Sequence, residues 1–194
     1  VSDISAYYSS PAFTPDGREI VVLRSAAAAR QQTSFESGRT REAELVLFPS
    51  VGGAPRVLAR GRFGSRPHFA ADPATVYVLA ADGLNAIDLS TGARRLIVQV
   101  KGPGYYFVEG TVPVDDLRIS PDGKHLLALV AQQLYLLETP AVGAEIDILA
   151  TPRAARRLTD VGTDFAEWRR DGSIDWSVGA QLSHLPRAGV TVVG

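Results

Sequence analysis

The feature that most constrains the fold of this chain is a strand, tight turn and strand unit that recurs along the sequence. Two clear copies occupy residues 10–23, with Thr-Pro-Asp-Gly at 14–17, and residues 115–129, with Ser-Pro-Asp-Gly-Lys at 120–124. Two weaker copies occupy residues 66–79 and 165–176. A large apolar residue precedes each turn, at intervals of about fifty residues; these residues are Phe13, Phe69, Ile119 and Trp168. A repeat of this length must be interpreted before any single element is assigned.

The residues of the turn favour a hairpin in each copy. Proline sets φ for the second position of a type I turn, aspartate bonds to nearby backbone, and glycine accepts the positive φ that follows. Further strands come after the turn in the same order, most clearly in the second copy: residues 84–89, a turn at 90–92, then residues 94–98. Four strands in a repeat of about 40 to 50 residues are typical of a β-propeller blade.

Apolar residues run almost continuously through the expected strands, as at Ile20–Leu23 and Leu126–Val130. Sheets that are buried on both faces show this pattern, whereas a β-sandwich, the alternative fold, favours strict alternation. We therefore predict an all-β chain that is a β-propeller or a propeller fragment, with about four blades of four antiparallel strands. The approximate blades are residues 7–60, 64–100, 114–160 and 163–194, with a loop insertion at 26–42 and an inter-blade connection at 101–113.

Charge and composition exclude several classes of function. A net charge of −1 and a pI near 6.3 provide no broad positive field for a phosphate backbone, so nucleic acid is not a predicted partner. A short basic run is interpreted as a solvated face; it comprises Arg56, Arg60, Arg62 and Arg66. No apolar run approaches the ~20 residues of a membrane span, and the first residues do not resemble a signal peptide. Because the chain begins with valine and contains no methionine, we expect it to be part of a longer polypeptide.

The sequence predicts no catalytic, metal or cofactor site. Cysteine is absent, and the three histidines, His68, His125 and His184, are far apart in the sequence, so local spacing assembles no metal site. Neither a Gly-X-Ser-X-Gly elbow nor a phosphate-binding glycine loop occurs. Asp115 and Asp116 are adjacent on an expected strand, so they point to opposite faces and are expected to be solvated at the entry to the third blade.

Five residues are candidates for contact with a ligand or partner. His68, Arg118 and Glu167 hold aligned positions just before the large apolar residue of a blade, on the strand expected to line the central channel. Their alternative role is hydrogen bonding between blades. Tyr105 and Tyr106 lie in the glycine- and proline-containing connection, where aromatic residues either form a binding lip or cover an exposed edge.

Together, the Pro-Asp-Gly corners, Leu134-Tyr135 and Arg157-Leu158-Thr159 make the chain resemble TolB-type β-propellers, whose blades show these motifs in this order. The resemblance implies the fold over almost the whole chain. It leaves the function open, because such propellers occur in proteins with several different functions. The last blade, residues 157–179, is similar to the propeller that precedes a metal-dependent amidohydrolase barrel in large bacterial hydrolases.

That narrower resemblance implies a non-catalytic module of a larger hydrolase, which gates access to the active site or docks a partner, in a periplasmic or secreted protein. The alternatives are a stand-alone protein–protein interaction scaffold and the propeller domain of a prolyl-oligopeptidase-type peptidase. The expected partners are a downstream catalytic domain or another protein. Because four blades are few for this family, an open arc would expose apolar blade faces, and we predict self-association through the end blades.

Overall fold

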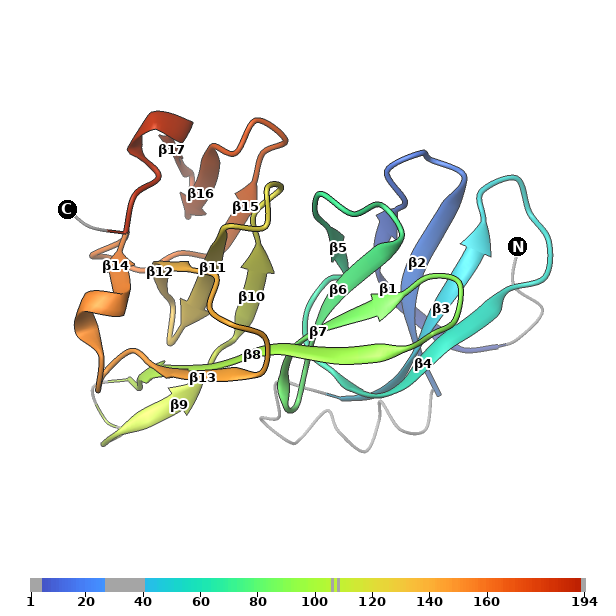
Figure 1. Cartoon of the computed structure of the whole chain (residues 1–194), viewed down its shortest axis with the longest axis horizontal. Coiled ribbons are helices and arrows are strands. Elements are labelled where there is room, and N and C mark those ends of the chain that lie inside the picture. Colours follow the sequence, from blue (N-terminus) through green and yellow to red (C-terminus); the bar gives the residue numbers. More distant parts are fainter. Residues whose placement is uncertain (1–4, 27–40, 106, 108, 193–194) are drawn as a thin grey trace. The chain divides into compact units, whose positions relative to one another are not determined.

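The computed structural model describes residues 5–26, 41–105, 107 and 109–192 (Figure 1). These residues contain seventeen β-strands and two 3₁₀ turns, η1 (Pro152–Ala154) and η2 (Arg187–Gly189). The all-β prediction is confirmed. The chain divides into two compact units, residues 1–96 and 97–194, and each is described by itself below.

The first unit begins with an antiparallel sheet in chain order: β1 (Tyr7–Phe13), β2 (Glu19–Ser25), β3 (Arg41–Pro49) and β4 (Arg56–Phe63). The register between β1 and β2 shifts between Ser9 and Ala12, so a bulge accommodates Pro11 in this edge strand. The predicted insertion at 26–42 lies almost entirely outside the described residues.

A second group of strands follows in the first unit: β5 (His68–Phe69), β6 (Thr75–Ala80), β7 (Gly83–Asp88) and β8 (Arg94–Pro103), whose later residues belong to the second unit. β6 pairs with β4 in antiparallel orientation, with Phe63 opposite Ala80. Side chains from both groups of strands form one core: Val21, Leu23, Leu45, Leu47, Leu58, Phe63, Val76, Val78, Ala80 and Ile87. Burial of this shared apolar surface holds the two groups together.

The second unit contains a four-stranded antiparallel sheet with the order β10 (Asp116–Ile119), β11 (His125–Val130), β12 (Gln133–Glu138) and β14 (Ala155–Arg157). It lies within residues 114–160, the range expected for the third blade. Both faces are buried: Leu127 and Leu136 are register partners on one face, and Leu126 and Leu137 are partners on the other.

The last sheet has three strands among the described residues: β15 (Phe165–Trp168), β16 (Ile174–Val178) and β17 (Gln181–Leu185). A fourth strand was predicted here, but Pro186 and η2 follow β17 instead, and Val190 and Val192 pack against the core. Proline lacks the N–H group that would continue a ladder. The core shared by the two sheets contains Leu127, Leu134, Leu136, Trp168 and Ile174.

The connection expected at residues 101–113 contains strand pairing that the sequence did not predict. β8 continues to Pro103 and forms a hairpin with β9 (Thr111–Pro113). On its other side, β13 (Ala144–Asp147) pairs with β8 in parallel, with Ala144 opposite Val98. Lys101 forms ion pairs with Glu145 at 2.9 Å and Asp147 at 3.7 Å across this pairing.

Candidate functional site

The repeated turns hold the first strand of a sheet against the second. In the turn at 120–124, the hydroxyl of Ser120 donates to Asp122 Oδ1 at 2.7 Å and accepts from the backbone N–H of His125 at 2.9 Å. Gly123 has a φ of 74°, a conformation that favours glycine. The Ser120 hydrogen bond holds the pKa of Asp122 below its usual range. This carboxylate is therefore engaged within the turn.

The other turns use the same chemistry. Thr14 Oγ1 donates to Asp16 Oδ1 at 2.7 Å. Asp72 accepts from the Thr75 hydroxyl at 2.7 Å, and Asp171 accepts from the hydroxyl of the residue two positions later at 2.6 Å. In each case the hydroxyl lowers the pKa of the aspartate. Each corner thus engages its aspartate with a hydroxyl: the hydroxyl precedes the aspartate at 14–16 and 120–122, and it follows the aspartate at 72–75 and 171–173.

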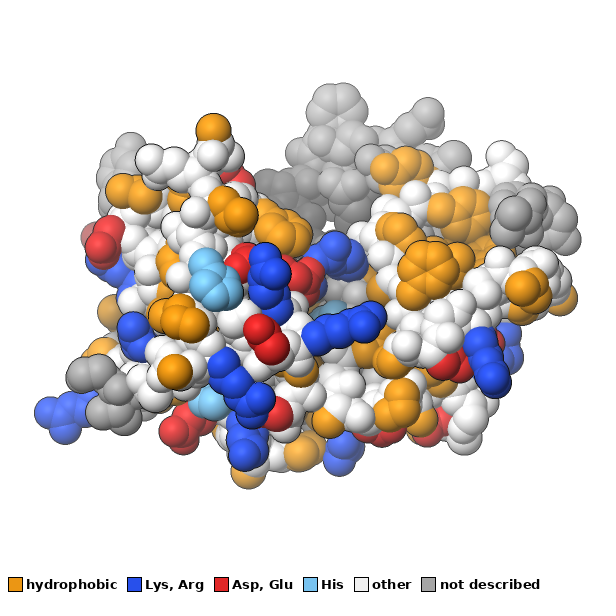
Figure 2. Space-filling model, turned by 90° about the horizontal axis from the view of Figure 1, so that it is seen from above, with side chains coloured by type: hydrophobic (Ala, Val, Ile, Leu, Met, Phe, Trp, Pro, Cys, Tyr) orange, Lys and Arg blue, Asp and Glu red, His pale blue; other side chains and the backbone are white. Residues whose placement is uncertain are grey.

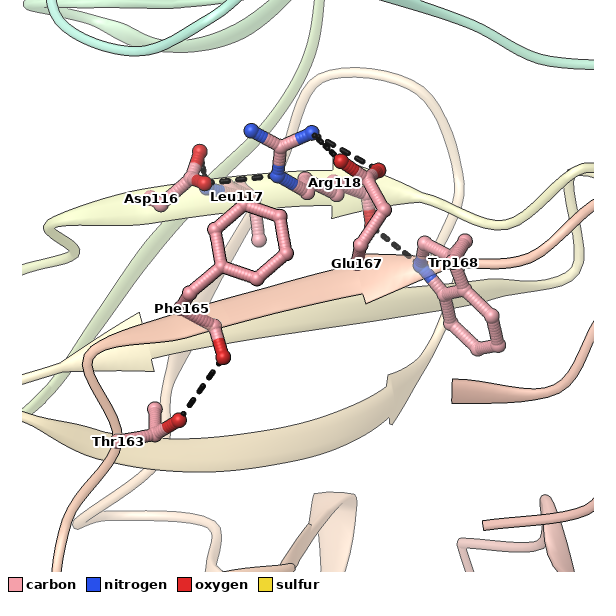
Figure 3. A network of polar contacts seen from close by, with 7 residues as sticks. All are labelled: Asp116, Leu117, Arg118, Thr163, Phe165, Glu167 and Trp168. Carbon is pink, nitrogen blue, oxygen red and sulfur yellow. Dashed lines mark hydrogen bonds and ion pairs between the residues drawn. The ribbon is translucent and has the colours of Figure 1, made fainter. Parts of the chain in front are cut away.

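A polar cluster of the second unit joins the edge strands β10 and β15 (Figure 3). Arg118 donates from Nε to Asp116 Oδ2 at 2.8 Å. Its Nη1 donates to both carboxylate oxygens of Glu167, at 3.0 and 3.1 Å. The Arg118 side chain is only 6% exposed, whereas those of Asp116 and Glu167 are 23% and 33% exposed. We call these three residues the inner-strand cluster.

Trp168 ties the inner-strand cluster to the apolar core. Its indole N–H donates to the carbonyl oxygen of Arg118 at 3.2 Å, and its ring belongs to the core between the two sheets (Figure 3). Just before β15, the hydroxyl of Thr163 donates to the carbonyl oxygens of Phe165 and Ser177, at 3.1 and 2.9 Å. The start of β15 is thereby fixed, which sets the position of Glu167 relative to Arg118.

The inner-strand cluster has one guanidinium and two carboxylates, so its formal charge is −1 when both acids are ionised. Charge-assisted hydrogen bonds of this kind are stronger than neutral ones. Asp115, on the opposite side of the strand from Asp116, accepts from the backbone N–H of Ala131 at 2.8 Å. Both Asp115 and Asp116 are partly exposed, and in addition each carboxylate accepts a hydrogen bond from the protein.

Of the five predicted contact residues, the structure brings Arg118 and Glu167 together as a pair between sheets. His68 lies in the other unit, on β5, half-buried and stacked on Tyr77 with ring centroids 5.8 Å apart. Tyr105 is half-buried and stacks on Phe107 at 5.4 Å. Tyr106 lies outside the described residues. A role for any of these five residues in binding stays a prediction.

Two polar groupings were missed from the sequence. Asp116 precedes Arg118 by two positions, so the two side chains share a face of β10, and this spacing was a usable signal. On β16 and β17, His184 Nδ1 is 2.7 Å from Asp175 Oδ1, and Arg169 also pairs with Asp175. The His184 hydrogen bond lowers the pKa of Asp175. Asp175 and His184 are register partners in neighbouring strands, which a prediction of strand positions alone does not reveal.

Within the described ranges, no group of three or more histidine, cysteine or acidic residues is arranged to hold a metal ion. A search of the same residues finds no helix that is long and apolar enough to cross a membrane.

Comparison with known proteins gives one family match. The model of the family described as "Lipoprotein LpqB beta-propeller domain" matches residues 1–192. This match confirms the predicted propeller fold class and the resemblance to TolB-type propellers. No curated protein shows a significant match to the sequence.

Several solved structures are similar in fold at low sequence identity. An oligogalacturonate lyase in complex with manganese aligns over 94% of this chain and 50% of its own, with a TM-score of 0.52 and 11% identity. The β-propeller domain of the Trilobed protease from Pyrococcus furiosus aligns over 89% and 48%, with a TM-score of 0.44 and 14% identity. A putative TolB from Agrobacterium tumefaciens aligns over 89% and 70%, with a TM-score of 0.46 and 16% identity. This chain spans about half the length of the lyase and of the protease propeller.

Proposed function

This chain belongs to the lipoprotein LpqB β-propeller domain family, and from that premise we propose that it is a non-catalytic propeller module of a larger, exported protein. Its role is to dock a partner or to gate access to a neighbouring domain. The partner is a downstream domain of the same polypeptide or another protein.

The main support for a structural and docking role comes from one polar cluster. The side chains that the fold gathers on the edge strands are engaged with one another: Arg118 is buried and donates to both Asp116 and Glu167. A general acid or base needs hydrogen-bond reach to a substrate, and these groups are committed to holding two sheets together. The polar cluster therefore serves the architecture, and binding falls to surfaces and loops around it.

Export is supported by the family's name, which is that of a lipoprotein. We further propose that the larger protein is a hydrolase of the amidohydrolase type, with this module beside its catalytic barrel. This part of the proposal is supported by the sequence resemblance of residues 157–179 alone.

Activity measurements on two preparations test the proposal. The chain alone and the complete protein that contains it are each assayed for amide hydrolysis, with and without added Zn²⁺. We expect turnover by the complete protein and none by the chain alone. Turnover by the isolated chain would contradict the non-catalytic assignment. An inactive complete protein would contradict only the proposal that the larger protein is a hydrolase.

Docking is tested separately by removing the module. Deletion of residues 1–194 from the complete protein should release or misplace the partner domain, seen as new protease-sensitive sites outside the deleted region. An unchanged cleavage pattern and unchanged activity would refute both docking and gating.

A further inference from the structure

The segment that follows the last strand packs against the core between the two sheets of the second unit. β17 ends at Leu185, and residues 186–192 come after it, with the turn η2 near their start. Val190 and Val192 of this segment pack against the core that the four-stranded sheet shares with the last sheet. In Figure 1 the segment runs, in red, from η2 down toward β14. We call residues 186–192 the strap.

The strap fills a place that the unequal number of strands leaves in the second unit. The four-stranded sheet has β14 as its fourth strand, whereas the last sheet has three strands among the described residues. Arg156 of β14 is the register partner of Leu136, so its side chain lies on the face that contributes to the shared core. The two valines of the strap supply apolar side chains at this outer end of the core, away from the inner-strand cluster.

Arg156 makes the shortest hydrogen bonds that attach the strap to the sheets. Its Nη1 donates to the carbonyl oxygen of Gly189 at 2.9 Å and to that of Thr191 at 3.1 Å. Within the described residues, the hydrogen bonds between backbone groups of the strap join its members only to one another, at 2.8 to 3.1 Å. A single guanidinium therefore takes the place of the ladder that would attach a fourth strand.

Arg187, near the start of the strap, contributes less to its attachment. Its Nη1 donates to the carbonyl oxygen of Asp171 at 3.5 Å, and its Nη2 is 4.0 Å from Asp122 Oδ2. The Arg187 side chain is 71% exposed, and Figure 2 shows charged side chains of both signs at the surface of the second unit, on the left. Long contacts in exposed, charged surroundings are weak. Arg156 is therefore the main polar attachment of the strap.

The apolar contacts of the strap are close, but they are made by few side chains. A Cβ on Gly189 would lie 2.8 Å from Leu185 Cδ1, so the strap backbone lies directly on a side chain of β17. Val190 and Val192 are half-buried, whereas Ala188 and Thr191 are exposed. A half-buried valine stabilises a contact less than one that is fully buried. The strap is therefore attached more weakly than the strands beneath it.

We propose that the strap opens and closes as a unit while the sheets of the second unit remain folded, and that Arg156 keeps it closed. Segments with few buried apolar side chains and exposed backbone open at a lower free energy than the sheets that they cover. Opening uncovers the outer end of the core, where Leu158, Trp176 and Leu185 pack. The strap thus controls access to the apolar space between the two sheets. This inference does not depend on the proposed function.

Limited digestion of the chain with trypsin tests the proposal, because trypsin cleaves after arginine and the strap contains the bond between Arg187 and Ala188. When opening and closing are fast compared with cleavage, the rate at this bond follows the population of the open strap. Arg156→Met keeps the apolar stem and removes both hydrogen bonds to the strap. Cleavage after Arg187 should therefore be at least about tenfold faster in this variant than in the wild type.

Two further variants and one internal reference complete the experiment. Val190→Ala reduces the apolar contact from the strap itself and should raise the rate about threefold. Arg157→Met is the matched control, since Arg157 lies on the same strand but pairs with Asp160 and is 52% exposed; it should leave the rate unchanged. Cleavage after Arg169, in the corner of the last sheet, reports unfolding of the sheet and should be the same in every variant.

Three results would overturn the proposal. A wild-type strap that is cleaved as fast as a free peptide of residues 180–194 would show that it is not closed. An Arg156→Met rate equal to that of the wild type, or matched by Arg157→Met, would show that Arg156 does not keep it closed. A rise in cleavage after Arg169 equal to the rise after Arg187 would show that the sheet unfolds together with the strap.

Discussion

Replacing Arg118 by methionine should destabilise the second unit strongly, although methionine retains most of the apolar stem. The Arg118 side chain is 6% exposed, and its guanidinium donates to Asp116 and to both oxygens of Glu167. Removing one partner of a buried ion pair costs about 3–5 kcal/mol, since the remaining charge is left without compensation. Here the two carboxylates keep contact with water, so we expect a loss of about 2–3 kcal/mol in the free energy of unfolding.

The position of the tryptophans makes the measurement selective. The chain has two, Trp168 and Trp176, and both lie in the last sheet, so their fluorescence reports on the second unit. Urea unfolding has a slope of about 1–3 kcal/mol per molar for small proteins. The transition midpoint of Arg118→Met should therefore lie about 1 M below that of the wild type.

Arg157→Met is the matched control for this substitution. Arg157 pairs with Asp160 at 2.6 Å, but their side chains are 52% and 90% exposed. An exposed pair contributes about 0.5 kcal/mol or less, so the midpoint should scarcely move. Glu167→Gln, which keeps an acceptor, should fall between the two variants. Equal midpoints for the Arg118 and Arg157 variants would refute the assignment of the inner-strand cluster as a link between sheets.

Four further substitutions test the turns and the acid response. A Cβ on Gly92, which has a φ of 73°, would lie 2.4 Å from a β4 carbonyl oxygen. Gly92→Ala should therefore lower the free energy of unfolding, measured by thermal unfolding, by about 2–3 kcal/mol. Gly123→Ala is the control: Gly123 has a similar φ but open space around it, so the loss should be only about 1 kcal/mol. Ser120→Ala removes a hydroxyl that bonds twice within its turn, so the urea midpoint should show a loss of about 1–2 kcal/mol; an unchanged midpoint would contradict the role of the corner. Hydrogen bonds, of which the one from the Ser90 side chain has the largest effect, lower the pKa of Asp88 from 3.8 to about 2. The contribution of the Asp88 carboxylate to folding stability is therefore complete above pH 3.8 and is lost as the pH falls through 2. In Asp88→Asn, the loss of stability at acid pH, followed by circular dichroism, should be less steep than in the wild type. An equally steep loss would contradict the role assigned to Asp88.

The corners explain why so much of the fold could be predicted. Their conformation is set within a few residues, by hydroxyl-to-aspartate hydrogen bonds and by glycines such as Gly17 and Gly123 at positive φ. Local chemistry of this kind is visible in sequence and recurs with the repeat. The strands on either side of each corner therefore lie where the repeat indicates, including β10 and β11 around the corner at 120–124.

The remaining features depend on contacts between distant residues. β13 pairs in parallel with β8 although more than forty residues separate Ala144 from Val98, and the sequence of β13 carries no turn signal. Aligning the repeats identified Arg118 and Glu167 as equivalent positions, but it did not indicate that they bind each other. That pairing arises because neighbouring sheets present their edge strands to one another, a property of the assembled fold.

A crystal structure of the chain is the most direct test of the central claim, that the corners mark equivalent places in successive sheets. The account predicts that the corners at 14–18 and 120–124 superpose, that each joins the first two strands of its sheet, and that Arg118 bridges Asp116 and Glu167. Corners at inequivalent places in the sheets, or Arg118 directed into solvent, would contradict both the repeat architecture and the role assigned to its polar cluster.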